Sequence, residues 1–376
     1  MSDTLALAKK LIAFRSITPD DGGCLDLIAQ RLAKAGFACE RVDRGEARNL
    51  WARRGEGTPL VCLAGHIDVV PPGAIERWTS DPFTPTERDG CLFGRGAADM
   101  KTSVAALVTA AERFIAARPD HRGSLALVFT SDEEGAGVDG TAAVVQRLQA
   151  RGVQIDACIL GEPTSSALLG DLMKHGRRGS LNGVLTVRGV QSHIAYAEQG
   201  RNPVHMVLPA LTELAGMELD RGNADFSPTT FQISNMHAGA GANNTIPGTL
   251  EVWFNFRFST ESTADQLKSR VHAILDAHDV DYDLAWTLTA TPFLSPRGRL
   301  VEVVRAAVAS VTGVTPALST SGGTSDGRFL AEISREVVEF GPVNKSIHAI
   351  DEHVQLADID PLSAIYEQSI AELLAG

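Results

Sequence analysis

The chain has 376 residues, of which 44% are hydrophobic and 21% are charged. This length exceeds what one hydrophobic core usually supports, so we expect two domains. The net charge of −12 disfavours nucleic acid and anionic membranes as partners, and no apolar run approaches the roughly 20 residues that a membrane helix needs.

The N-terminal segment and the cysteines both indicate the cellular compartment of the protein. Residues 2–12 are acidic early and amphipathic throughout, which favours a capped surface helix over a signal peptide. The five cysteines are scattered, odd in number and without C-x-x-C spacing, which favours a reducing compartment and disfavours thiolate metal ligands. We therefore expect a cytoplasmic protein.

Up to about residue 178, short apolar runs alternate with longer amphipathic stretches. This pattern predicts a layered α/β domain whose strands are buried on both faces. We predict helices at residues 5–14, 23–35, 102–118 and 140–151, and strands at residues 49–53, 60–64, 125–129 and 157–160.

A different pattern begins near residue 179. Its order of strand, helix, strand, strand, helix, strand predicts a ferredoxin-like βαββαβ unit, with elements at residues 181–188, 203–217, 229–236, 249–258, 263–278 and 282–288. Helical patterns return at residues 300–311 and 362–374. We therefore expect an α/β catalytic domain made of residues 1–178 and 293–376, with a mixed sheet and helices on both faces, and an inserted dimerisation domain made of residues 179–292.

Polar side chains follow the ends of three predicted strands. His66 and Asp68 follow the strand at 60–64, Glu133 and Glu134 follow the strand at 125–129, and Glu162 follows the strand at 157–160. In an open α/β sheet, ligands collect beyond the carboxyl ends of the strands. Each residue alone reads more simply as an ordinary loop or turn residue, but five at corresponding positions indicate a site.

Asp99 lies in a Gly-rich turn and His348 lies near the C-terminus, and both extend this set of oxygen and imidazole ligands. Such a set suits two zinc-like ions that share one carboxylate. Asp99 is short and central, so we expect it to bridge the ions. His66 and Glu162 would complete the shell of one ion, and Glu134 and His348 that of the other.

Two acidic residues remain for other roles. Asp68 follows His66 by two residues and would orient its imidazole through the second ring nitrogen. Glu133 is adjacent to a ligand without being one, so it could take a proton from the bridging water and return it to a leaving amine.

Several residues outside this set indicate an anionic substrate. Arg177 lies at the predicted domain junction, Arg257 ends a strand of the insert, and the turn at 322–327 precedes a predicted helix whose N–H groups could bind an anion. His193 and Asn243 lie in loops of the insert, where polar groups could polarise a carbonyl. Each of these residues could also be an ordinary surface charge or loop residue without a role in binding.

The motifs resemble those of the co-catalytic di-zinc aminoacylase and carboxypeptidase family. They lie in order over nearly the whole chain, at residues 65–71, 94–101, 131–135, 161–164, 176–180, 243–247 and 321–327. The resemblance implies two Zn²⁺ ions, which Co²⁺ could replace, and a homodimer formed through the inserted domain. It also implies hydrolysis of N-succinyl-LL-2,6-diaminopimelate in lysine and cell-wall precursor synthesis, and a cis peptide bond between Asp99 and Met100.

The same resemblance assigns a substrate pocket. The residues that would line it are Arg177, Ser180, Arg257, Gly323, Thr324 and Asn344, with His193, Tyr196 and Asn243 reaching it from the other subunit. One departure is Thr102, where the family pattern has glycine; it lies beyond the ligand and leaves the metal site undisturbed.

Three alternatives remain to be weighed against this hypothesis. Deacetylation of N-acetylornithine or a related acylamino acid needs the same metal core, and the arginines favour a dianionic acyl group instead. A metal-binding protein without catalysis is disfavoured by Glu133. Nucleotide binding through residues 94–99 fails because the third glycine of the pattern is replaced by Asp99.

Overall fold

The computed structural model describes residues 2–239 and 241–375. The chain forms two compact units. The first consists of Met1–Gly176, Leu294–Ser319 and Ser325–Gly376, and the second of Arg177–Phe293 and Thr320–Thr324. The short segment Thr320–Thr324 lies outside the insert expected from sequence. It is tied to the second unit by hydrogen bonds from Thr320 Oγ1 to the Asp225 carbonyl oxygen at 2.6 Å and from Arg177 Nη1 to the Gly323 carbonyl oxygen at 3.1 Å.

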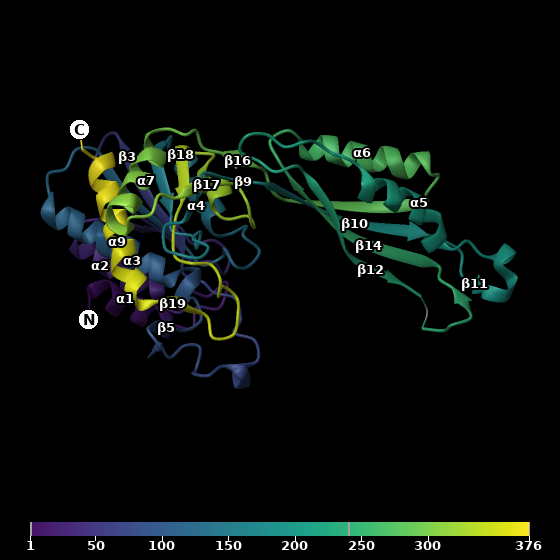
Figure 1. The fold of residues 1–376 in the computed structure, drawn as a ribbon, viewed down its shortest axis with the longest axis horizontal. Coiled ribbons are helices and arrows are strands. Elements are labelled where there is room, and N and C mark those ends of the chain that lie inside the picture. The colour runs from purple at the N-terminus through teal and green to yellow at the C-terminus, as the bar shows by residue number, and fades with distance from the viewer. Residues whose placement is uncertain (1, 240, 376) are drawn as a thin grey trace. The chain divides into compact units, whose positions relative to one another are not determined.

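The first unit is built on an eight-stranded mixed sheet (Figure 1). The central strand β3 is parallel to both of its neighbours, β6 and β7, and β18 is parallel to β7. Strands β1 and β2 are antiparallel to each other, and β2 is antiparallel to β6. In spatial order the strands are β1 (Ala38–Arg41), β2 (Asn49–Arg54), β6 (Ser124–Thr130), β3 (Leu60–His66), β7 (Ile155–Leu160), β18 (Ser334–Glu339), β8 (Leu172–Lys174) and β17 (Ala317–Ser319).

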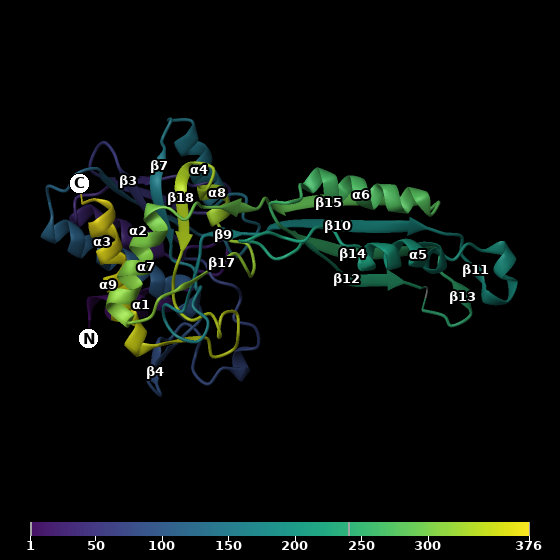
Figure 2. The same ribbon diagram turned by 45° about the horizontal axis from the view of Figure 1, so that its top comes forward.

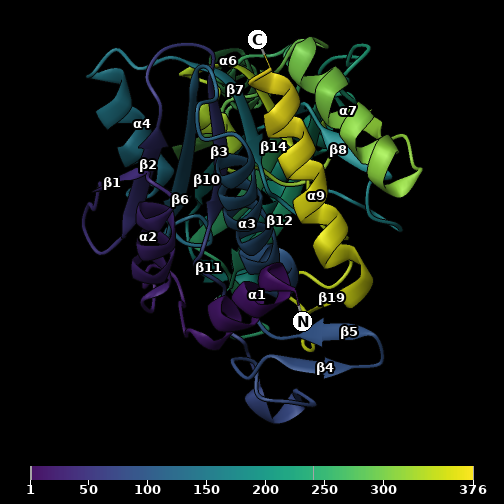
Figure 3. The same ribbon diagram turned by 90° about the vertical axis from the view of Figure 1, so that its left-hand side faces the viewer.

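Helices cover both faces of this sheet. One face packs against α1 (Asp3–Ala13), α2 (Cys24–Lys34), α3 (Thr102–Ala117), α7 (Arg299–Thr312) and α9 (Leu356–Leu373), which Figure 3 shows in front of the strands. The other face packs against α4 (Thr141–Gln149), which contacts α8 (Gly327–Leu330). Leu63 and Leu127 point into the core with the first group of helices, and the alternating Cys62 and Ala126 are equally buried. Burial on both faces explains why β3 and β6 are largely apolar.

A smaller sheet of three strands lies beside the main one in the first unit. Its order is β19 (His353–Gln355), β5 (Cys91–Phe93) and β4 (Thr86–Arg88). This sheet brings the segment after His348 next to the segment before Asp99.

The second unit has the predicted βαββαβ order. Its elements are β10 (Gly179–Arg188), α5 (Pro203–Gly216), β12 (Thr230–Ala238), β14 (Thr249–Phe258), α6 (Ala264–Ala277) and β15 (Tyr282–Ala290), and the sheet order is β12-β14-β10-β15. Figure 2 shows α5 and α6 along this sheet. In β14, Val252 and Phe254 are buried in the core with both helices, whereas Trp253 between them is 44% exposed. The sheet is therefore covered on one face, as the alternation in sequence predicted.

The α/β fold class with helices on both faces is confirmed, but some elements differ from the prediction. Helix α9 begins at Leu356, six residues before the predicted start, and contains Pro361. Pro361 is the sixth residue of the helix, where proline removes one hydrogen bond and crowds the carbonyl four residues earlier. Ile359 is already buried in the core, so packing outweighs that cost. Strand β18 was not predicted at all. Of the helices within residues 2–239 and 241–375, none is both long and apolar enough to cross a membrane.

Candidate metal centre

The parallel strands β6, β3 and β7 bring three predicted ligands to one edge of the sheet. His66 is the last residue of β3, Glu134 follows β6 by four residues, and Glu162 follows β7 by two. Because these neighbouring strands are parallel, their carboxyl ends meet at the same edge. The strand ends therefore place the three side chains close together.

Asp99 lies between two histidines. Its Oδ1 atom is 3.1 Å from His66 Nε2, and its Oδ2 atom is 3.6 Å from His348 Nε2. One carboxylate therefore presents its two oxygens to two different imidazoles. The peptide bond between Asp99 and Met100 is cis, which confirms the expectation from the family resemblance.

The predicted ligands form two groups with Asp99 in common. The ligand atoms of His66, Asp99 and Glu162 lie within 4.8 Å of one another, and so do those of Asp99, Glu134 and His348. His66 Nε2 is 4.0 Å from Glu162 Oε1, and His348 Nε2 is 2.9 Å from Glu134 Oε1. Imidazole nitrogens and carboxylate oxygens without thiolates are suitable zinc ligands, so the residues fit two ions that share Asp99.

Both histidines lie among negative charges. Burial alone would lower the pKa of His66, but the hydrogen bond to the Asp99 carboxylate and the charges of Asp99, Glu162 and Glu133 raise it well above its ordinary value. The hydrogen bond to Glu134 is the main cause of the raised pKa of His348. These shifts reflect a strongly anionic cluster of side chains, and divalent cations would neutralise the same charges.

Asp68 holds the backbone of the two adjacent glutamates. Its Oδ2 accepts a hydrogen bond from the Glu134 N–H at 3.0 Å, and its Oδ1 accepts one from the Glu133 N–H at 3.4 Å. The backbone carbonyl of Asp68 lies 3.0 Å from His66 Nδ1, whereas its carboxylate oxygen lies 3.6 Å away. The partner of the second ring nitrogen is therefore the carbonyl oxygen and not the expected carboxylate. Burial raises the pKa of Asp68 to about 6.

Glu133 lies beside the two ligand groups and belongs to neither. Desolvation raises the pKa of its carboxyl well above the ordinary value, the nearby charges of Glu162, Asp326 and Glu134 raise it further, and the charge of His66 opposes them. A raised pKa makes a carboxylate a stronger proton acceptor, and the protonated carboxyl can then donate the proton again. This is the position and the property that a general base requires.

The second unit brings part of the predicted pocket to one end of its sheet. Ser180 of β10 pairs with Arg257 of β14, and Arg177 donates to the carbonyl of Gly323, next to Thr324. Burial and the charge of neighbouring Arg178 lower the pKa of Arg257. This end of the second unit is therefore cationic, and Arg178 of the motif at residues 176–180 contributes to that charge.

His193, Tyr196 and Asn243 belong to the other end of the same unit. His193 lies in β11 (Ser192–His193), which pairs with β13 (Thr245–Ile246) beyond the carboxyl end of β10 (Figure 2). The rings of His193 and Tyr196 are 5.8 Å apart, and His193 Nε2 is 3.4 Å from Asn244 Nδ2. These side chains are exposed.

Asn344 lies in the first unit, four residues before His348, and its backbone N–H donates to the Ser165 carbonyl at 2.9 Å.

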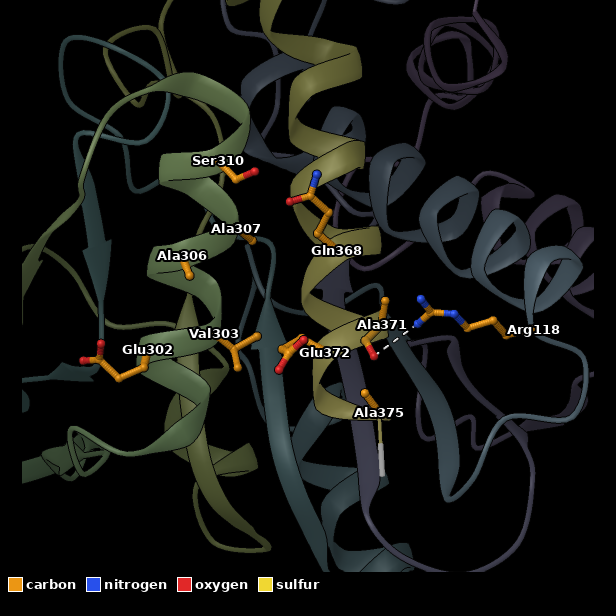
Figure 4. Close-up of a pocket in the computed structure, with 10 residues that line it drawn as sticks. All are labelled: Arg118, Glu302, Val303, Ala306, Ala307, Ser310, Gln368, Ala371, Glu372 and Ala375. Atoms are coloured by element: carbon orange, nitrogen blue, oxygen red, sulfur yellow. Dashed lines mark hydrogen bonds between the residues drawn. The ribbon is translucent and has the colours of Figure 1, made fainter.

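A surface hollow of about 560 Å³ between α7 and α9 is separate from all of the predicted site residues (Figure 4). It has an alanine-rich floor and is lined by Arg118, Glu302, Val303, Ala306, Ala307, Ser310, Gln368, Ala371, Glu372 and Ala375. None of the predicted site residues is among its lining residues.

The sequence analysis also missed a buried pair beside the ligands. Arg95 and Glu352 are 2% and 1% exposed, and Arg95 Nη1 is 2.7 Å from Glu352 Oε2. Arg95 lies between two glycines of the motif at residues 94–101, and Glu352 follows His348 by four residues. These two positions were the only signal of the pair in the sequence.

Comparisons with known proteins extend over the whole chain. Peptidase family M20/M25/M40 matches residues 62–372. Succinyl-diaminopimelate desuccinylase from Thiobacillus denitrificans (strain ATCC 25259 / T1) is 59% identical over 373 residues, which cover 99% of this chain and 95% of that protein. The protein of the same name from Azoarcus sp. (strain BH72) is also 59% identical, with 99% and 98% covered.

Solved structures share the fold at low sequence identity. The M20 family metallo-carboxypeptidase Sso-CP2 from Sulfolobus solfataricus has a TM-score of 0.82 at 15% identity, with 100% of both chains covered. The dinuclear metal-binding M20 peptidase YXEP from Bacillus subtilis has a TM-score of 0.73 at 15% identity, with 98% of this chain and 97% of that chain covered.

Proposed function

The chain belongs to peptidase family M20/M25/M40, and we propose that it hydrolyses N-succinyl-LL-2,6-diaminopimelate to succinate and LL-2,6-diaminopimelate. The observation that carries this proposal is the sharing of Asp99 by two ligand groups, with Glu133 beside them. The relatives that are 59% identical and carry the name succinyl-diaminopimelate desuccinylase support this substrate. The reaction belongs to lysine and diaminopimelate biosynthesis.

The two ligand groups would hold two zinc ions, with cobalt able to substitute. His66 and Glu162 would bind one ion, Glu134 and His348 the other, and Asp99 both. When bound, such ions lower the pKa of a coordinated water to about 7 and polarise a carbonyl oxygen. Zinc is favoured over magnesium or calcium because two of the five ligands are imidazoles.

Glu133 would move the proton in this reaction. It takes the proton that water loses when the oxygen attacks the amide carbonyl carbon, and it returns that proton to the amine nitrogen as the C–N bond breaks. Asp68 would hold the backbone of Glu133 in place for this role, because its carboxylate accepts from the backbone N–H groups of both Glu133 and Glu134.

The cationic end of the second unit would bind the substrate carboxylates. Arg257 is half-buried, and no described residue forms an ion pair with it, while the charge of Arg178 adds to the positive potential. Arginine can bind a carboxylate through two parallel hydrogen bonds. Arg177, Ser180, Gly323, Thr324 and Asn344 would complete this pocket. A succinyl group carries a carboxylate that an acetyl group lacks, so this cluster favours the succinyl substrate over N-acetylornithine.

We further propose a homodimer that shares its active sites. Strand β10 has ten residues, so its two ends are about 30 Å apart at about 3.3 Å per residue. Within one copy, Ser180 lies at the first end of β10 and His193 lies beyond the last. His193, Tyr196 and Asn243 would therefore serve the site of the other subunit, with His193 stabilising the oxyanion.

The edge of the second unit's sheet supports the same dimer. Strand β12 lies at the end of the sheet order, and its outer side pairs with no strand within the described part of the chain. Trp253 on the neighbouring strand β14 is 44% exposed. An open strand edge beside an exposed aromatic residue is suited to pairing with a second copy.

A product assay tests the proposed function. Purified protein is supplied with zinc, and succinate release from N-succinyl-LL-2,6-diaminopimelate is compared with acetate release from N-acetylornithine. We expect kcat/KM to be far higher for the succinyl compound. A preference for the acetyl compound would favour deacetylation of N-acetylornithine, and release of neither acid would refute amide hydrolysis of acylamino acids.

We place the reaction in the cytoplasm, where the five free cysteines stay reduced.

A further inference from the structure

The buried ion pair of Arg95 and Glu352 lies behind the candidate metal centre. Both side chains are almost fully buried, and Arg95 Nη1 is 2.7 Å from Glu352 Oε2. Burial of two charges carries a desolvation penalty that their mutual attraction often fails to offset. A role other than stability is therefore expected for this pair.

The Glu352 carboxylate is surrounded by N–H groups from the loop that carries Asp99. Its Oε1 accepts from the Ala98 N–H at 2.8 Å and from the Asp99 N–H at 2.9 Å. Its Oε2 accepts from the Gly96 N–H at 2.9 Å as well as from Arg95. One side chain thus fixes three backbone N–H groups of the loop, including that of the shared ligand itself.

The same pair contacts the segment that carries His348. Arg95 Nη2 donates to the His348 carbonyl at 3.4 Å, and the Gly94 N–H donates to the Glu352 carbonyl at 2.9 Å. Strand β19, which begins directly after Glu352, pairs with β5, directly before Gly94. Figure 3 shows these two strands side by side.

His348 has a backbone conformation that its neighbours must hold. Its φ angle is +58°, and that of Asp351 is +56°. Residues other than glycine rarely adopt this left-handed region, and they stay there only where surrounding contacts fix them. The Asp351 carboxylate accepts from the backbone N–H and the hydroxyl of Thr79, at 2.9 Å and 2.6 Å, while the backbone carbonyl of His348 accepts from Arg95.

We propose that Arg95 and Glu352 are positioning residues that set the geometry of Asp99 and His348 for metal binding. This inference rests on the proposed function, because it assumes that the two ligand groups hold ions. Asp99 and His348 are two of the three ligands in the group with Glu134, but only Asp99 belongs to the group with His66. Loss of the pair should therefore weaken the ion held by Glu134 and His348 more than the other ion.

Glu352→Gln tests this proposal, because glutamine keeps the size of the side chain and removes its charge. Chelator-treated protein is titrated with zinc by calorimetry and with cobalt by absorption spectroscopy. We expect one of two binding events to weaken by about ten- to a hundred-fold, as is typical when a group that orients metal ligands is lost. Activity should fall at limiting zinc and recover in part when zinc is raised.

Glu112→Gln is the matched control. Glu112 also forms an ion pair with an arginine, Arg31, but it lies on α3 about 15 Å along the helix from Thr102. This variant should bind both ions as the wild type does. A purely structural role of Glu352 would lower the thermal midpoint of the metal-free protein and leave both metal affinities unchanged, and that result would overturn the proposal.

Two further measurements keep the test decisive if Glu352→Gln does not fold. Arg95→Lys keeps the positive charge but replaces the two guanidinium nitrogens that contact Glu352 and the His348 carbonyl with a single ammonium nitrogen, so it should show the same selective loss of metal affinity. In wild-type protein without metal, the Ala98 and Asp99 amides should already be protected from hydrogen exchange. Rapid exchange of these amides in the folded metal-free protein would refute positioning by Glu352. Wild-type protein that binds no metal would instead refute the proposed function, and the inference would fail with it.

Discussion

Replacement of Glu133 by glutamine should remove most of the activity and leave both metals bound. The change keeps the size of the side chain and removes only its ability to accept a proton. Glu133 belongs to neither ligand group, and its contact with Asp68 is made by the backbone N–H, which the substitution does not alter. The fold and the metal sites should therefore persist.

The magnitude follows from the proton transfer that Glu133 would perform. General acid–base catalysis contributes about 10²- to 10⁴-fold to a rate. Because one residue would serve both the attack of water and the departure of the amine, we expect a loss of about 10³-fold or more in kcat. At about 1.4 kcal/mol for each factor of ten, this corresponds to about 4 kcal/mol of transition-state stabilisation.

The assay pairs kinetics with metal analysis. Succinate release and zinc content after dialysis are measured for wild type, Glu133→Gln and Glu134→Gln. The adjacent variant is the matched control: Glu134 lies 2.9 Å from His348 Nε2 within a ligand group, so Glu134→Gln should lose zinc as well as activity. Loss of one zinc equivalent from Glu133→Gln, or a kcat close to that of wild type, would show that the assignment of the base is wrong.

Three other predictions concern the substrate, the dimer and the metals. Arg177→Met and Arg257→Met each remove a charge-assisted contact worth about 1.5–3 kcal/mol, so kcat/KM for the succinyl substrate should fall by roughly ten- to a hundred-fold; equal losses on an acetylated analogue for both variants would refute recognition of the succinyl carboxylate. Verified mixed dimers of Glu133→Ala and His193→Ala chains should regain one intact site although each parent is nearly inactive, and mixed dimers as inactive as the parents would show that both groups act within one chain. Chelation should abolish succinate release and added Zn²⁺ or Co²⁺ should restore it, whereas full activity after verified metal removal would exclude metal-assisted hydrolysis.

The sequence was informative where burial and chemistry are both local. Strands β3, β6 and β7 are largely apolar because both of their faces are buried, and the polar residues at or just after their carboxyl ends lie at the sheet edge. His66 and Glu162 were placed correctly relative to each other for this reason. The βαββαβ order of the second unit could be predicted equally well, because residues along its strands alternate between the buried and the exposed face of the sheet.

The missed features depend on contacts that are distant in sequence. Strand β18 contains Arg335 and Glu336, and only pairing with β7 and β8 places its last residues in the core. The ion pair of Arg95 and Glu352 joins residues 257 positions apart. The hydrogen bonds from the N–H groups of the Asp99 loop to Glu352 join residues more than 250 positions apart and have no sequence pattern, so the support of Asp99 could be found only in three dimensions.

Anomalous diffraction at the zinc edge, from crystals grown with zinc, tests the central claim most directly. The account predicts two peaks, one among His66, Asp99 and Glu162 and the other among Asp99, Glu134 and His348, with one oxygen of Asp99 directed at each. A single peak at full occupancy, or two peaks without Asp99 between them, would contradict it.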